Sequence, residues 1–303
     1  MTDNNVTLAQ VVLHKGEVVS EFYAPDVTAQ TTLISWSMAK SMTHALVGIA
    51  QMDGLLNISD SHLFPEWESD DRRNITLQQL LEMRSGLSWV EDYVDGDSSD
   101  VIDMLFGSGK EDIARYAIAQ PLASVPGAEW VYSSGTTNIV SRLLGNALGD
   151  AHGSHTNTER YMRTRLLDAI GMQAVPKFDA AGTFVGSSYV FATARDFAKF
   201  GLLYLRDGVY DGVRILPEGW VDHAREQHVF DAETGLGYGA HWWTLPEERD
   251  SLVAAGYEGQ YIMVIPDRDL VVVRLGKTVA ELRNAVVAEL RKVIEQFPVI
   301  GAR

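Results

Sequence analysis

The sequence predicts a mixed α/β (α+β) fold, in which one antiparallel sheet flanked by helices is made from both ends of the chain. Two observations lead to this prediction. Runs rich in β-branched residues occur near both ends, at 6–14, 17–23, 261–265 and 270–275. The apolar residues between them recur mostly at helical spacing. We therefore expect a single domain with an α/β lobe of about 1–60 plus 185–303, and an inserted helical lobe of about 61–184.

Each end of the chain supplies a pair of strands with its own turn. Lys15-Gly16 separates the first two runs and is a short hairpin signal. Pro266-Asp267-Arg268-Asp269 has the composition of a turn and joins the last two runs. An amphipathic C-terminal helix follows, marked by apolar residues at helical spacing: Val279, Leu282, Val286, Leu290 and Val293.

Two helices of the middle segment are located by their caps. Thr76 and Gln79 form a capping box ahead of three leucines, and Gly86 fits the stop of that helix. Thr193 caps the second helix, which Gly208 ends. The polar stretch 149–158 contains Gly, His, Thr and Asn, so it is expected to be an exposed loop.

Composition excludes several classes of function. The net charge is −16 and the sequence pI is about 4.8, which argues against nucleic acid and anionic membranes as partners. The absence of cysteine rules out disulfides and thiolate chemistry. Neither a signal peptide nor an apolar run of 18 residues is present in the sequence, so a cytoplasmic location is expected.

Ser37 and Lys40 form an S-x-x-K pattern at the start of an apolar, helix-like run. A serine nucleophile activated by a lysine has this spacing, because residues three apart share one helix face. The chain has 20 Ser and 7 Lys, so chance gives about one such pair for every two chains of this composition. A capping serine followed by a solvated lysine would give the same pattern, and other motifs must decide.

Two further segments could contribute chemistry. Tyr132-Ser133-Ser134 lies between a loop and an apolar helix, so Tyr132 is either a core aromatic or a proton shuttle whose pKa a lysine lowers. Gly256-Tyr257-Glu258-Gly259-Gln260 opens a C-terminal strand. A backbone N–H there could form an oxyanion hole with that of Ser37, or the segment could be a simple turn into the strand.

The order of these motifs resembles the serine β-lactamase and penicillin-binding-protein superfamily. The resemblance is strongest to class C-like members, namely family VIII carboxylesterases and 6-aminohexanoate-dimer hydrolases. It covers nearly the whole chain and is carried by the following segments: Ser35–Lys40, Met83–Leu87, Glu91–Asp95, Tyr132–Ser134, Ala194–Asp196, Trp242-Trp243 and Gly259-Gln260. It implies a β-lactamase/transpeptidase-like fold with the active site between the two lobes.

The resemblance also implies roles for individual residues. Ser37 would be the nucleophile, and Lys40 and Tyr132 would exchange its proton. The N–H groups of Ser37 and Gln260 would hold the oxyanion. Tyr93 matches a tyrosine that lies over the substrate in the nylon-oligomer hydrolases and assists amide cleavage.

Two positions depart from the family pattern. The usual Lys-Thr-Gly or His-x-Gly triad is Tyr257-Glu258-Gly259 here, and the asparagine two residues after the tyrosine is Ser134. If these residues contact substrate as their counterparts do, the Glu258 carboxylate should disfavour anionic compounds such as penicillins and D-Ala-D-Ala peptides. We therefore expect small neutral or amine-bearing acyl compounds to be preferred.

Three apparent ligand motifs are incomplete. The segment 106–111 lacks the first glycine and the final Ser/Thr of a phosphate loop. The acidic stretch 95–100 lacks the glycine and glutamate of a calcium loop. His152 and His155 have no accompanying carboxylate pattern, so no metal and no cofactor are expected.

The sequence thus predicts a serine hydrolase that cleaves small ester or amide bonds through a Ser37 acyl-enzyme. One alternative is a true β-lactamase or D-amino-acid peptidase. A second is a non-catalytic, ligand-binding member of the superfamily. Apart from a small-molecule substrate, no nucleic-acid or membrane partner is expected, and the oligomeric state is left open.

Overall fold

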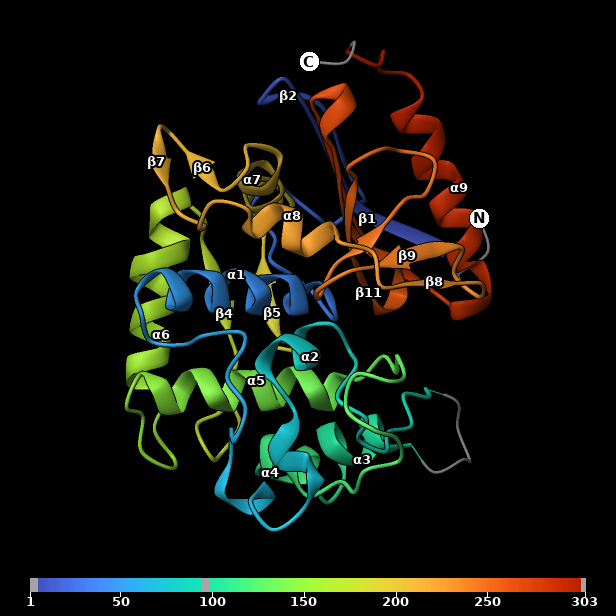
Figure 1. Cartoon of the computed structure of the whole chain (residues 1–303). Coiled ribbons are helices and arrows are strands. Elements are labelled where there is room, and N and C mark those ends of the chain that lie inside the picture. Colours follow the sequence, from blue (N-terminus) through green and yellow to red (C-terminus); the bar gives the residue numbers. More distant parts are fainter. Residues whose placement is uncertain (1–4, 94–98, 301–303) are drawn as a thin grey trace.

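A computed structural model describes residues 5–93 and 99–300 of the chain. Its main feature is a sheet of eight strands in the order β2-β1-β13-β12-β11-β10-β9-β8, with every neighbouring pair antiparallel. The strands of this sheet are β1 (Asn5–His14), β2 (Glu17–Tyr23), β8 (Val229–Asp231), β9 (Leu236–Tyr238), β10 (Trp243–Thr244), β11 (Leu252–Gly256), β12 (Gln260–Ile265) and β13 (Leu270–Thr278). Figure 1 shows the first and last strands side by side.

The pairing of β1 with β13 confirms that both ends of the chain build one sheet. Their register runs from Asn5 opposite Thr278 to His14 opposite Leu270. The turn between β1 and β2 has positive φ at both Lys15 and Gly16, which is the backbone of a two-residue hairpin. Two small sheets complete the strands, made of β3 (Leu33–Ile34), β5 (Val190–Ala192) and β4 (Ala174–Pro176), and of β6 (Val209–Tyr210) and β7 (Val213–Arg214).

Helices pack against the sheet, and most of them come from the part of the sequence between its N-terminal and C-terminal strands. Their bounds are α1 (Met38–Met52), α2 (Leu77–Leu81), α3 (Asp100–Phe106), α4 (Ile113–Ile118), α5 (Ser134–Ala147), α6 (Thr156–Met162), α7 (Ala194–Leu205), α8 (Trp220–Arg225) and α9 (Arg283–Ile294). The capping box on α2 and the Thr193 cap on α7 are present as predicted. The expected loop at 149–158 is shorter than predicted, because α6 begins at Thr156.

Helix α1 is the centre of the molecule. Every residue of this helix from Met38 to Ala50 is buried, so no face of it is exposed along this stretch. The reason is that α1 packs against α5 and against strands β11 and β12. Figure 1 shows α1 crossing the middle of the molecule above α5. Lys40 and His44 are therefore buried with the apolar residues, and each must find a polar partner there.

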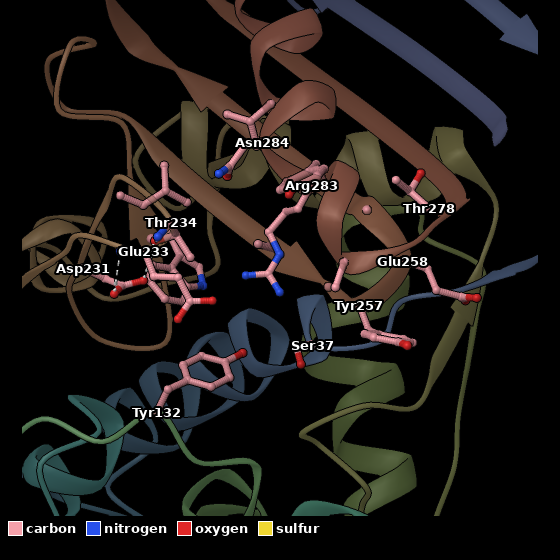
Figure 2. A pocket seen from close by; sticks show the side chains of 18 of the residues that line it. Ser37, Tyr132, Asp231, Glu233, Thr234, Tyr257, Glu258, Thr278, Arg283 and Asn284 are labelled. Atoms are coloured by element: carbon pink, nitrogen blue, oxygen red, sulfur yellow. Dashed lines mark hydrogen bonds between the residues drawn. The ribbon is translucent and has the colours of Figure 1, made fainter. Parts of the chain in front are cut away.

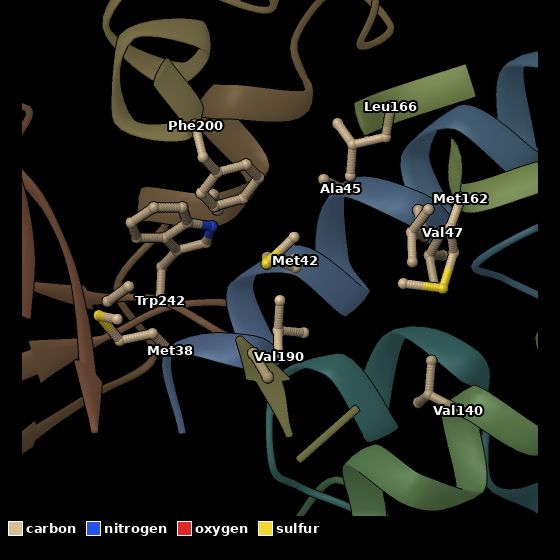
Figure 3. Packing of buried hydrophobic residues seen from close by; sticks show 14 of the residues in the cluster. Met38, Met42, Ala45, Val47, Val140, Met162, Leu166, Val190, Phe200 and Trp242 are labelled. Carbon is tan, nitrogen blue, oxygen red and sulfur yellow. The ribbon is translucent and has the colours of Figure 1, made fainter. Parts of the chain in front are cut away.

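The core divides into two clusters on the two faces of the sheet. The larger one surrounds α1, where Met42 packs near Phe200 and Trp242 (Figure 3). The smaller one lies between the sheet and α9, and its helix contribution comes from Val286, Val287, Leu290 and Ile294. Among the helices of the described ranges, none combines the length and the apolar character needed to cross a membrane.

Candidate active site

Ser37 lies at the N-cap of α1 and faces a cavity of about 280 Å³. Trp36, directly before it, has φ of 43°, a conformation that costs a bulky residue strain. Contacts hold Trp36 there, since its ring packs edge-on against Tyr257 and its Nε1 donates to Glu258 at 3.1 Å. The strained residue sets the entry of the chain into α1 and so the position of the serine.

Lys40 is buried one turn further along α1 and its side chain returns to Ser37. Its Nζ lies 3.0 Å from Ser37 Oγ, 2.9 Å from Ser134 Oγ and 3.1 Å from the Ser187 carbonyl oxygen. Burial lowers the pKa of Lys40 to about 8, against the opposing effect of the Glu91 carboxylate. A substantial fraction of Lys40 is therefore neutral slightly above neutral pH, as a general base requires.

Tyr132 lies beside this pair, with its ring centroid 4.8 Å from Lys40 Nζ. Trp243 stacks on the ring and Tyr238 packs edge-on against it. The sequence left two roles open for Tyr132, a core aromatic or a proton shuttle whose pKa a lysine lowers. The lowering is not found: burial and the Glu91 carboxylate raise that pKa well above 10, outweighing the lowering effect of hydrogen bonding with Ser37. Tyr132 therefore remains a protonated phenol, which can donate a proton.

Glu91 is a site residue that the sequence analysis did not single out. Its two carboxylate oxygens accept hydrogen bonds from Ser134 N at 2.8 Å, Ser134 Oγ at 2.5 Å, Trp89 Nε1 at 2.6 Å and Tyr93 Oη at 2.9 Å. Only its place in a family-like segment could have suggested it. Ser134 was expected to bind substrate. It is instead fully buried between Lys40 and Glu91, and its hydroxyl is used by those two partners.

The predicted oxyanion donors lie at the junction of α1 and β12. Within 5–93 and 99–300, the Ser37 N–H has no hydrogen-bond acceptor, so it is available to a ligand. Gly256 is necessary at this point, because a Cβ there would lie 2.4 Å from the Ser35 carbonyl oxygen and 3.2 Å from Ser37 N. The Gln260 side chain is committed to the Tyr257 and Gly276 carbonyl oxygens, which leaves its backbone N–H as the predicted donor.

The remaining predicted residues lie around the mouth of the cavity. Tyr93, Tyr257, Glu258 and Gly259 all line it. Tyr93 stacks on Tyr257 with a centroid distance of 5.1 Å. Glu258 has φ of 60°, and Figure 2 shows its carboxylate pointing away from Ser37. The sequence analysis assumed that the Glu258 carboxylate contacts the substrate and repels anions. This assumption is corrected, since the carboxylate faces the Trp36 indole.

Arg283, at the start of α9, is the second residue that sequence reasoning missed. It is the only cation among the described residues that line the cavity. Its guanidinium points into the space above Ser37 and Tyr132 (Figure 2). Asp231, the last residue of β8, and Glu233, on the β8–β9 connection, line the same cavity. The lining of the cavity thus combines a cationic group from α9 with acidic groups from β8 and the connection after it.

No group of three or more His or acidic side chains that could hold a metal occurs within the described residues. The incomplete calcium-like stretch falls largely at 94–98, outside those residues. His44 is fully buried, and its Nδ1 lies 2.9 Å from Tyr204 Oη. It therefore belongs to the packing behind the site.

Two comparisons with known protein sequences found matches over most of the chain. The family described as Beta-lactamase matches residues 3–293. The 6-aminohexanoate-dimer hydrolase of Paenarthrobacter ureafaciens is 25% identical over 291 residues, covering 90% of this chain and 73% of that protein.

Solved structures show the same fold. A Bacillus anthracis protein described as a candidate 6-aminohexanoate-dimer hydrolase superposes with a TM-score of 0.81, at 21% identity over 98% of this chain and 81% of that one. The octameric penicillin-binding protein homologue of Pyrococcus abyssi gives 0.74, at 16% identity over 96% and 74% of the two chains. With a family match over almost the whole length and the same architecture, this chain belongs to the β-lactamase family.

Proposed function

We propose that this protein is a serine hydrolase that cleaves small ester or amide bonds through an acyl-enzyme on Ser37. The observation that carries the proposal is the approach of Lys40 Nζ to within 3.0 Å of Ser37 Oγ, at the wall of the cavity. The lowered pKa of Lys40, to about 8, gives this amine the strength of a base that works near neutral pH.

The geometry supports a two-step reaction. Neutral Lys40 takes the proton of Ser37 as Oγ attacks the substrate carbonyl, and the Ser37 and Gln260 N–H groups stabilise the oxyanion. Collapse of the tetrahedral adduct breaks the bond to the leaving group. Tyr132 gives that group a proton and is reprotonated from Lys40. Water then attacks the ester, with Lys40 again as base, and releases the acid and free Ser37.

We infer esters or amides of short acyl groups as the substrate class. The relative from Paenarthrobacter ureafaciens is a 6-aminohexanoate-dimer hydrolase, which favours amides among these. Because Arg283 faces Ser37, a substrate carboxylate would also be accommodated. The same observation favours a second candidate function, hydrolysis of β-lactams or D-amino-acid peptides, since such substrates carry a carboxylate next to the scissile amide.

The test is a hydrolysis screen over p-nitrophenyl esters, small amides and a chromogenic cephalosporin, with the Ser37→Ala protein as the blank. We expect a burst of p-nitrophenol and an acyl mass adduct on the peptide that contains Ser37. An adduct on Ser41 or Ser134 would contradict the assignment. Failure of a fluorophosphonate probe to label Ser37 would favour the non-catalytic, ligand-binding alternative.

A further inference from the structure

We propose that Glu91 is a positioning residue of this site, which acts through Ser134 to orient the Lys40 amine toward Ser37 and to balance its charge. The inference rests on the proposed function. It adds a role for a carboxylate that does not contact the Ser37 hydroxyl. It is carried by the hydrogen bonds around three side chains: Lys40, Glu91 and Ser134.

The Glu91 carboxylate is saturated with donors. Each of its two oxygens accepts two hydrogen bonds, which together come from Ser134 N, Ser134 Oγ, Trp89 Nε1 and Tyr93 Oη. It also lies at the N-terminus of α5, a helix of 14 residues, where the helix dipole favours a negative charge. A Cβ at Gly135 would lie 2.4 Å from the Trp89 ring, so this glycine lets Trp89 reach Glu91.

Glu91 determines which way the Ser134 hydroxyl points. A serine hydroxyl has one hydrogen, and at 2.5 Å from the Glu91 carboxylate that hydrogen is donated to Glu91. Ser134 Oγ can therefore only accept from Lys40 Nζ, 2.9 Å away. The Ser187 carbonyl oxygen, at 3.1 Å, can likewise only accept.

The orientation of the Lys40 amine follows from this count. Neutral lysine has two N–H hydrogens and one lone pair. If both hydrogens are donated to Ser134 Oγ and the Ser187 carbonyl oxygen, the lone pair is left for the third neighbour, the Ser37 hydroxyl at 3.0 Å. That is the arrangement in which Lys40 takes the serine proton. Without the Glu91 carboxylate, the Ser134 hydroxyl could turn and donate to the same lone pair.

The charge of Glu91 acts on the same amine. The described groups that face Lys40 are Ser37 of its own helix, Ser134 of α5, the Ser187 carbonyl, the Tyr132 phenol and His241. Burial keeps Tyr132 protonated, and burial lowers the pKa of His241 to about 3, so both are neutral at pH 7. Glu91 is thus the anion that opposes the effect of burial on the Lys40 pKa.

The test compares Glu91→Gln with the wild type between pH 5.5 and 9.5, on a p-nitrophenyl ester. We expect kcat to fall 10- to 100-fold while KM stays within about threefold, because both Glu91 oxygens are already occupied by protein donors, although Glu91 lines the cavity. The acid limb of the kcat/KM profile should move to lower pH, because loss of the carboxylate lowers the pKa of Lys40. Asp150→Asn is the matched control, since Asp150 accepts two backbone N–H groups at the N-terminus of α6, and its profile should match the wild type.

Two further variants keep the inference testable if Glu91→Gln folds poorly. Ser134→Ala should reproduce the loss in kcat, and the double variant should lose little more than either single one. A double variant whose loss equals the product of the single losses would mean that Glu91 does not act through Ser134. An unchanged kcat and an unchanged acid limb in Glu91→Gln would also overturn the proposal.

A readout independent of turnover separates this inference from the proposed function. The chain has seven lysines, so the Cε signals of ¹³C-lysine-labelled protein can be followed by NMR, with Lys40 assigned from a Lys40→Met sample. The pH at the midpoint of the Lys40 titration should be lower in Glu91→Gln than in the wild type, and it should be unchanged in Asp150→Asn. If wild-type protein forms no Ser37 adduct while the midpoint still moves, the hydrolase proposal fails and the coupling of Glu91 to Lys40 stands. A Lys40 midpoint that does not move would exclude this coupling.

Discussion

The two walls of the cavity differ in how their polar groups are held. Behind the wall that contains Ser37 and Tyr132, Lys40 of α1 and Ser134 of α5 are buried; the two side chains are hydrogen-bonded to each other, and Ser134 is hydrogen-bonded to Glu91. On the opposite wall, Arg283 and Glu233 are exposed. Within the described ranges, neither of these two side chains has an ion pair.

This difference separates chemistry from selectivity. When its partner is removed, a buried polar group stays desolvated but unpaired, and the folded protein is destabilised by the full desolvation penalty. The buried group of side chains therefore tolerates little change. Exposed charges are screened by water and contribute about 1 kcal/mol or less each. Changes in the buried group should therefore lower turnover strongly, whereas changes in the exposed wall should alter which substrate is preferred.

The largest effect should come from Lys40 and Tyr132. Lys40→Ala and Tyr132→Phe should each lower kcat by about 10³-fold, on the scale of general acid–base catalysis, because each removes a step in the same proton transfer. The double variant should be little worse than the single ones. Steady-state kinetics on one ester test this, and losses that multiply would show that the two residues act independently.

Low pH should reduce the stability of the protein, because buried histidines lie behind the catalytic residues. Burial lowers the pKa of His241 to about 3 and also lowers those of His44 and His223. The unfolded chain then binds more protons than the folded one below pH 6.5, so stability falls as pH falls. From pH 7 to 5, His241 alone should cost about 2 kcal/mol of unfolding free energy.

Urea unfolding at pH 7.5 and 5.0 measures this loss. His241→Asn should be less stable than the wild type at pH 7.5, because His241 hydrogen-bonds the Leu81 carbonyl oxygen and lies 3.0 Å from Thr137 Oγ1. Its dependence on pH should nevertheless be smaller. Asparagine suits this position, where φ is 55°. The same pH slope in both proteins would exclude His241 as a source of the acid sensitivity.

Tyr93 lies between the two walls, because its hydroxyl donates to Glu91 while its ring stacks on Tyr257. An amide leaving group needs a proton as it departs, whereas a phenoxide does not. Tyr93→Phe should lower amide hydrolysis about tenfold and p-nitrophenyl ester hydrolysis less than threefold. Equal losses on matched amide and ester substrates would reduce Tyr93 to a packing residue.

The smallest effects should come from the charges of the second wall. Arg283→Gln should lower kcat/KM for a carboxylate-bearing ester about three- to fivefold, relative to its neutral analogue. Glu258→Gln should change that ratio less, because the Glu258 carboxylate faces Trp36. A larger gain for anionic esters in Glu258→Gln than the loss in Arg283→Gln would restore the role that the sequence suggested for Glu258.

The sequence by itself determined the features that depend on neighbours along the chain. The Lys15-Gly16 hairpin, the Thr76 capping box and the Ser37–Lys40 spacing are each specified within a few residues, and the structure contains all three. The order of the motifs predicted the family and the fold, and both are confirmed. Local motifs of this kind can be recognised in a single sequence, because backbone geometry determines how residues a few positions apart are placed.

Only the tertiary structure decided how distant side chains meet. Glu91 and Ser134 are 43 positions apart, and no periodicity indicates that a loop carboxylate reaches the first turn of α5. The same is true of Arg283 above Ser37 and of Glu258 turned toward Trp36. The direction of the Tyr132 pKa shift could not be derived from the sequence for the same physical reason. Burial and the sign of the nearest charges determine a pKa, and both are properties of the packed chain.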